Sequence, residues 1–221
     1  MCKRTDRRAR GGGEAGFSLI ELMVALGVTL VIMVVASQLL AMSMAVRSRE
    51  NQRAEAVADA QRALQAMTRE ISNAGLGMSN NGLVDEDSDD LSIRVRSNLN
   101  AFCAAGVACD SDTGDAGEDV IFAVINNTTG GGGDNQRLIT RQDKNSSDAI
   151  SPLANRVDGL EFQYYTSGGA ETATASLAQK VKITVTVTLP AVGSPKTAGY
   201  QPASQVQLTS EAVLRNLLLS L

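Results

Sequence analysis

The chain has no histidine and no tryptophan, and aromatic residues make up only 3% of its 221 residues. Without histidine, it has no histidine-based catalytic triad and no histidine ligand for a metal. It also lacks a G-x-S-x-G nucleophile motif and a G-x-x-x-x-G-K-[ST] phosphate loop. So few aromatic side chains offer little for sugars or single-stranded nucleic acid to stack on. We therefore expect no enzyme and no cofactor, although an acid pair within the acidic loops stays open.

Helix breakers are scarce in the first third of the chain. Between Phe17 and Asn73 there is no proline and a single glycine, Gly27. This predicts one continuous helix of about 85 Å at 1.5 Å per residue, which is much longer than a bilayer requires.

The beginning of this helix is an apolar run that reaches to about Leu40 and contains one acidic residue, Glu21. Placing a carboxylate in a bilayer costs ~3 kcal/mol or more, so such a residue normally has a partner. If the peptide bond after Gly16 is cut, the new amine of Phe17 lies four residues from Glu21, about one helical turn away. The pair then consists of a cation and an anion, within one chain or between neighbouring chains.

The segment GFSLIELMVALGVTLVIMVV resembles the N-terminal signature of type IV pilins and type II secretion pseudopilins. The resemblance implies that residues 1–16 are a leader and that a prepilin peptidase cuts between Gly16 and Phe17 and methylates the Phe17 amine. It also implies that Glu21 pairs with the N-terminus of an adjacent subunit when residues 17–44 stack into a filament. The implied partners are this peptidase, other pilin or pseudopilin subunits, the inner membrane and the assembly machinery.

Two other interpretations of the segment are an ordinary signal peptide and an uncleaved membrane anchor. Ser43-Met44-Ala45 would serve as a signal-peptidase site, and an extracytoplasmic binding or enzymatic domain would follow. The apolar run is longer than the 7 to 15 residues of a typical signal peptide. Neither interpretation gives Glu21 a role.

The charge distribution favours export of everything after the helix. The chain has 20 basic and 24 acidic residues, and the leader holds five of the basic and two of the acidic ones. The rest of the chain therefore has 15 basic and 22 acidic residues, a net charge of −7. This balance argues against nonspecific binding of nucleic acid. The basic leader predicts a cytoplasmic N-terminus in the inner membrane and a periplasmic C-terminal domain before assembly into a fibre. Basic residues just beyond the apolar run oppose that orientation: Arg47, Arg49 and Arg53.

Loss of the leader removes Cys2 and leaves two cysteines, Cys103 and Cys109, around a loop of small residues. In an oxidising compartment we expect a disulfide between them, which would stabilise the domain by ~2 kcal/mol. Two free or buried thiols are the alternative. A metal site is not expected, because there are no further thiol or imidazole ligands.

The second part of the helix, residues 45–73, is amphipathic. Its apolar residues recur every three or four positions: Val57, Ala60, Leu64, Met67 and Ile71. We interpret this stripe as the face that packs on a β-sheet, and a short coiled coil as the less favoured alternative. Gly75 is placed to terminate the helix near Asn73.

Two acidic loops follow the helix, at residues 84–90 and 110–119. The first has Asp-x-Asp-x-Asp spacing, but Asp90 and Arg96 stand where an EF-hand has glycine and glutamate. Solvated charge is the ordinary interpretation of such loops, and calcium binding is a minor alternative.

Residues 74–221 contain several segments that predict strands: some alternate apolar and polar residues, 120–125 is a short apolar run, and 136–141 follows it after a glycine-rich hairpin connection. These segments are 91–95, 120–125, 136–141, 160–164, 181–189 and a last strand beginning at Val206. We therefore expect an α+β fold of pilin type, in which the long helix packs on a mostly antiparallel sheet. The segments 157–165, 181–189 and 214–216 resemble the C-terminal pattern of PilW-type minor pilins and J-type minor pseudopilins.

Overall fold

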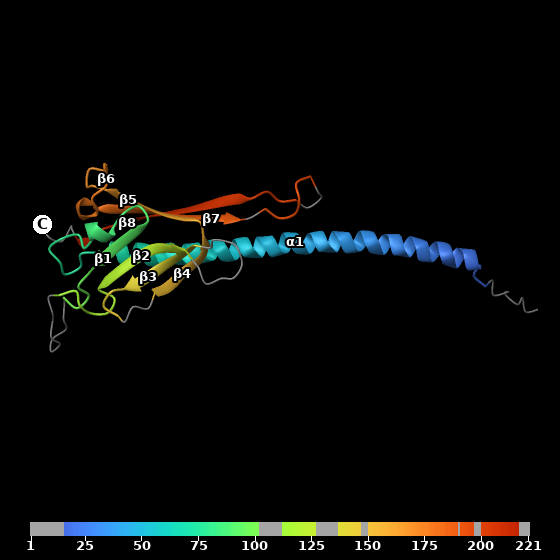
Figure 1. The fold of residues 1–221 in the computed structure, drawn as a ribbon, viewed down its shortest axis with the longest axis horizontal. Helices are drawn as coiled ribbons and strands as arrows, with labels where there is room; N and C mark the ends of the chain where they lie inside the picture. The colour runs from blue at the N-terminus through green and yellow to red at the C-terminus, as the bar shows by residue number, and fades with distance from the viewer. Residues whose placement is uncertain are drawn as a thin grey trace, which may run out of the picture. The chain divides into compact units, whose positions relative to one another are not determined.

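The computed structural model describes residues 16–101, 112–126, 137–146, 150–189, 191–196 and 200–216. The chain divides into two units, Met1–Val46 and Arg47–Leu221. Figure 1 shows the elements along the described residues. Their bounds are α1 Leu19–Ser72, η1 Asp85–Asp87, β1 Ser92–Arg96, β2 Asp119–Asn126, β3 Arg137–Asp143, β4 Ile150–Val157, β5 Gly159–Tyr165, β6 Glu171–Thr172, η2 Ala175–Leu177, β7 Lys180–Leu189 and β8 Ser204–Val213.

The described part of the first unit is residues 16–46, which include the N-terminal portion of α1, and every residue in it is exposed. This portion holds an 18-residue window with a mean hydropathy of 2.7, none of which is buried. By length and composition, α1 can cross a membrane. The absence of proline from this stretch lets the helix continue without a break.

In the second unit, α1 turns one apolar face inward. The predicted stripe is confirmed for Ala60, Leu64, Met67 and Ile71, all of which are buried. Val57, however, is only half-buried, and Ala56 takes its place. Ala56 precedes Ala60 by four residues and therefore lies on the same helical face.

The strands form two sheets of four strands each. The first sheet has the order β1-β2-β3-β4 and the second β6-β5-β7-β8, with antiparallel pairing throughout. The α+β prediction is confirmed, and the strands divide between two sheets where the sequence predicted one. The chain passes from the first sheet to the second at Asp158, the single residue between β4 and β5.

Strict alternation identified β7 best. In β7 the side chains of Val181, Ile183, Val185, Val187 and Leu189 are buried and those between them are not. The sequence did not predict β4 or the short β6. Pro152 lies within β4, and proline normally argues against a strand because it has no backbone N–H to donate.

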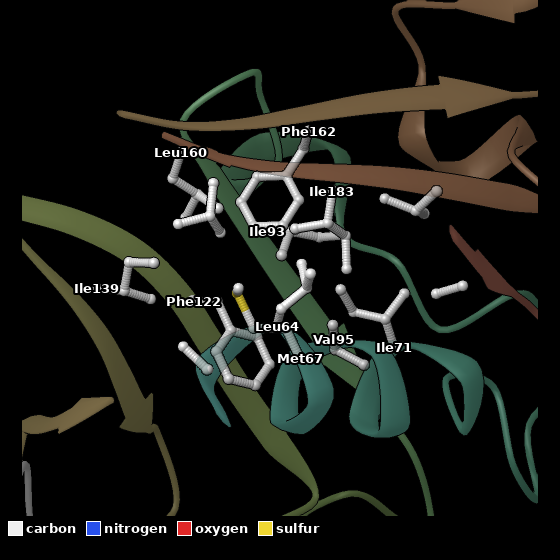
Figure 2. Close-up of a cluster of buried hydrophobic side chains, with 14 of the residues drawn as sticks. Leu64, Met67, Ile71, Ile93, Val95, Phe122, Ile139, Leu160, Phe162 and Ile183 are labelled. Atoms are coloured by element: carbon white, nitrogen blue, oxygen red, sulfur yellow. The ribbon is translucent and has the colours of Figure 1, made fainter. Parts of the chain in front are cut away.

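One core joins α1 to both sheets. Figure 2 shows Leu64 and Met67 of α1 beside Phe122 of β2, with Phe162 of β5 and Ile183 of β7 completing the cluster. Each of these side chains except Leu64 is at most 2% exposed. Full burial of a side chain of this size contributes about 1.5–3 kcal/mol, so this cluster is a main source of stability for the second unit.

The helix ends in a turn that requires glycine, as predicted. Gly75 has a φ of 73°, in the left-handed region, and its N–H donates to the Arg96 carbonyl at 2.9 Å. A side chain there would meet the backbone oxygen of Asn80 at 2.5 Å. Only glycine combines this φ with such a close approach of backbone.

Candidate functional site: the N-terminal helix

The structure places the predicted processing site immediately before α1. Gly16 and Phe17 are exposed and precede the helix, which begins at Leu19. The carbonyl of Ser18 accepts the first helical hydrogen bond, from the backbone N–H of Leu22 at 3.2 Å. With the leader still attached, Phe17 therefore lies just outside the helix, on an accessible backbone.

Glu21 lies in the first turn of α1 and is exposed. Within the described part of the chain, no hydrogen bond or ion pair satisfies its carboxylate. A negative charge near a helix N-terminus is favourable, because the first backbone N–H groups carry partial positive charge. That position leaves the carboxylate available for a cation from outside the chain.

On both sides of Glu21 in the sequence, from Phe17 to Val46, the exposed surface is dominated by apolar side chains. Phe17 is 82% exposed, Leu19 77% and Ile20 70%, and exposed Leu, Val, Ile and Met residues continue to Val46. Such a surface is far larger than the apolar patches of a soluble monomer. A helix that is apolar all round requires a bilayer or other helices around it.

Two hydroxyl groups in this apolar stretch bond within the helix. Thr29 Oγ1 donates to the Ala25 carbonyl at 2.6 Å, and Ser37 Oγ donates to the Met33 carbonyl at 2.8 Å. Both of these hydroxyls thus pair with the carbonyl one turn earlier, which removes much of the cost of placing them in an apolar environment.

The first acidic loop uses its carboxylates within the protein. Asp85 accepts from the backbone N–H of Ser176 at 2.7 Å and from its hydroxyl at 2.6 Å, and these bonds hold the pKa of Asp85 below its usual value. Asp89 accepts from the backbone N–H groups of Leu91 and Ser92 at the start of β1. These contacts give the loop a structural explanation that needs no calcium.

An ion cluster joins the two acidic loops across β1. Arg94 binds Asp119 at 2.7 Å and Asp87 at 2.6 Å, and Arg96 binds Asp119 at 3.0 Å. Burial raises the pKa of Asp119, but the hydrogen bonds from the two arginines outweigh burial and leave the pKa below its usual value. Hydrogen bonding to Asp119 in turn raises the pKa of Arg94. Asp119 is therefore held as an anion at the centre of the cluster.

The predicted disulfide residues, Cys103 and Cys109, lie outside the described residues, so their pairing remains a prediction.

Several contacts that hold segments of the second unit together were not predicted from the sequence. Arg49, which is 9% exposed, donates to the Gln201 side chain at 2.7 Å and to the Pro202 carbonyl at 2.6 Å. Asn216 Nδ2 donates to the carbonyls of Asn73 at 3.1 Å and Ala74 at 2.9 Å, and so caps the end of α1. These partners lie more than 140 positions apart, and no local pattern indicates them.

Two grooves lie beside the C-terminal end of α1. The larger, of about 360 Å³, is lined by residues of α1 and β8 and by Asn73 and Arg215, with no carboxylate or thiol among them. In the smaller groove, of about 210 Å³, the acidic residue is Glu70, which pairs with Arg141 at 3.0 Å. Neither lining combines a nucleophile with a free acid or base.

Comparison with known proteins finds one family match, described as "Prokaryotic N-terminal methylation motif", at residues 12–37. The matched segment contains Gly16, Phe17, Glu21 and the first half of the apolar helix. No curated protein and no solved structure matches the chain. The second unit is therefore interpreted from its own geometry.

Proposed function

We propose that this chain, which belongs to the type IV pilin and pseudopilin family by its N-terminal methylation motif, is a minor pilin. In this proposal, prepilin peptidase cuts it between Gly16 and Phe17 and methylates the new amine. The mature subunit is then anchored in the inner membrane until it is assembled into a type IV pilus through its N-terminal helix. There it initiates or caps the fibre. Its length of 221 residues, larger than is usual for a major pilin, motivates the minor role.

One observation carries the proposal: the matched motif overlaps the wholly exposed, apolar N-terminal portion of α1, which has a single carboxylate without a described partner. A plain anchor explains the apolar surface and leaves Glu21 unexplained. A filament subunit explains both, because neighbouring helices cover the surface and a neighbouring chain end supplies a cation.

The pairing mechanism follows from elementary electrostatics. Cleavage creates a positively charged amine at Phe17, and methylation keeps that charge. In an apolar filament core, attraction between this amine and Glu21 of an adjacent subunit is much stronger than in water. Pairing offsets the free-energy cost of burying each charge alone. The charges can pair only when the helices of adjacent subunits are in the correct register, so assembly favours that register.

A minor pseudopilin of a type II secretion system is the runner-up, since it would use the same residues in a different machine. The neighbouring genes distinguish the two, because one role predicts pilus genes and the other a secretion operon. In either role we propose a structural subunit and no enzyme.

The mature N-terminus tests the proposal. Mass spectrometry of the protein purified from membranes should find a chain that begins with N-methylated Phe17. A chain that begins at Val46 would show signal-peptidase cleavage after Ala45 and would support an exported binding or enzymatic domain. A chain that keeps residues 1–16 would also overturn the proposal.

A further inference from the structure

The hairpin of β7 and β8 is aligned with the helix of the second unit by contacts along its length. Near the C-terminal end of α1, the backbone N–H of Arg215 donates to the Ser72 carbonyl at 3.4 Å. One turn earlier in α1, Thr68 Oγ1 donates to Ser210 Oγ at 3.0 Å. β8 therefore runs alongside α1 and in the same direction.

The start of β8 is fixed near the beginning of the second unit. Arg49 holds Gln201 and Pro202, as described above. Gln201 also pairs with Val192 in an antiparallel bridge, with backbone hydrogen bonds of 2.9 Å in both directions. The hairpin tip thus lies at the Arg49 end of the unit, which is the end that is covalently continuous with the apolar run.

This end of the unit carries exposed positive charge. Arg47 and Arg53 on α1 and Lys196 in the tip are exposed, and among the described residues none of the three forms an ion pair. Residues 47–53 and 191–201 together hold four basic residues and one acidic residue. The rest of the second unit holds 11 basic and 20 acidic residues. A unit that is acidic overall therefore has one basic end.

The basic end of the second unit begins where the apolar run of the first unit stops. Arg47 is the first charged residue after Glu21. The two are 26 positions apart, which corresponds to about 39 Å of helix, close to the ~40–45 Å thickness of a bilayer with its head groups. With Glu21 at one face of the bilayer, Arg47 reaches the head-group layer of the other.

Basic residues on the exported side oppose the charge bias that orients membrane proteins, so they need a local explanation. We propose that Arg47, Arg53 and Lys196 bind the phosphates of anionic phospholipids in the outer leaflet of the inner membrane. This inference rests on the membrane anchoring in the proposed function. The arginine guanidinium groups match phosphate oxygens in pairs, and the lysine adds a point charge. The contacts of Arg49 with Gln201 and Pro202 hold the start of β8, and with it the hairpin tip, at the end of the unit where Arg47 and Arg53 lie.

The test uses the full chain reconstituted in vesicles of phosphatidylcholine with a minor fraction of phosphatidylglycerol. The wild type is compared with the triple variant Arg47→Gln/Arg53→Gln/Lys196→Gln. The matched control is Arg62→Gln/Arg69→Gln/Arg215→Gln, which removes the same charge from exposed residues elsewhere in the unit. After extraction in mild detergent, mass spectrometry counts the lipids that remain bound to each protein.

Wild type and control should retain phosphatidylglycerol in preference to phosphatidylcholine. The triple variant should lose about fivefold in this preference for each charge removed. Equal retention by the two triple variants, or no enrichment of phosphatidylglycerol, would overturn the inference. So would saturable binding of inorganic phosphate without lipid, or lipid-independent crosslinking of Lys196 to another pilin subunit.

Alkaline carbonate extraction separates this result from the proposed function. A wild-type chain that resists extraction but shows no lipid preference contradicts only the lipid inference. A wild-type chain that washes off the membrane contradicts the anchoring, and with it the proposed function.

Discussion

The two units of this chain use their apolar residues in opposite ways. From Phe17 to Val46 the large apolar side chains all face outward. In the second unit, apolar residues of the same kinds, such as Leu64, Met67 and Ile71, are turned into a core shared with two sheets. The apolar side chains of the first unit can thus be buried only by a bilayer or other chains, whereas those of the second unit are buried against its own sheets.

This difference predicts where a mutation acts. A change in the first unit alters assembly while leaving the fold of the second unit intact. A change in the core of the second unit alters stability before it alters any contact with partners. The following substitutions test that division, from the largest expected effect to the smallest.

Met67→Ala should destabilise the second unit by about 2–5 kcal/mol, because it opens a cavity at a fully buried position. Urea unfolding of the full chain in detergent, followed by circular dichroism of the sheets, measures the change. Met33→Ala is the matched control, since Met33 is 66% exposed in the first unit. Equal midpoints for the two variants would contradict the division.

Asp119→Asn should lower the free energy of unfolding by about 3 kcal/mol at neutral pH, because it leaves two arginines without their shared anion. The folded pKa of Asp119 is depressed, so its contribution is present above the unfolded pKa of about 3.9 and is lost as pH falls through the lower folded value. Acid titration of stability should therefore be flatter in the variant than in the wild type.

The control for this titration is Asp112→Asn, at an exposed carboxylate that accepts, among the described residues, from the nearby Gly114 N–H at 2.9 Å. It should change stability by no more than about 0.5 kcal/mol. An Asp119→Asn variant with the acid profile of the wild type would refute the role given to the ion cluster.

Glu21→Ala should leave membrane insertion and leader cleavage largely intact, since it removes only the pairing carboxylate. Incorporation into fibres should fall about a hundredfold, the equivalent of ~3 kcal/mol for a charge left unpaired in an apolar core. Quantifying the subunit in sheared filament fractions tests this. Glu50→Ala, at an exposed helix glutamate of the second unit, should assemble normally, and normal assembly of Glu21→Ala would count against the mechanism.

Arg49→Gln should loosen the hairpin tip without unfolding the sheets. Hydrogen bonds from a charged donor contribute about 1.5–3 kcal/mol, so local opening should increase roughly tenfold or more. Limited trypsin digestion, with cleavage after Lys196 followed by mass spectrometry, detects the change. Arg53→Gln, which removes no contact within the described residues, should be cut at the wild-type rate.

A structural feature could be predicted from the sequence when the residues that determine it are close together along the chain. The strand β7 was evident because its alternation is contained in ten consecutive residues. β4 was missed because Pro152 breaks that signal and only pairing with β3 makes the segment a strand. The Arg49 contacts were missed because Gln201 lies 152 positions away, and nothing near either residue indicates the other.

By itself, the sequence determined the N-terminal chemistry: the order of Gly16, Phe17 and Glu21 before an apolar run is local, and a processing enzyme or a bilayer can act on it directly. It also determined the long helix and its buried stripe, because helical periodicity is a property of neighbouring residues. Only the tertiary structure decided that the strands divide into two sheets and that Asp119 joins two arginines. It alone brought the β7–β8 tip to Arg49. Such features depend on which segments, distant in the sequence, bury their apolar side chains against one another. Those contacts form only when the whole core packs.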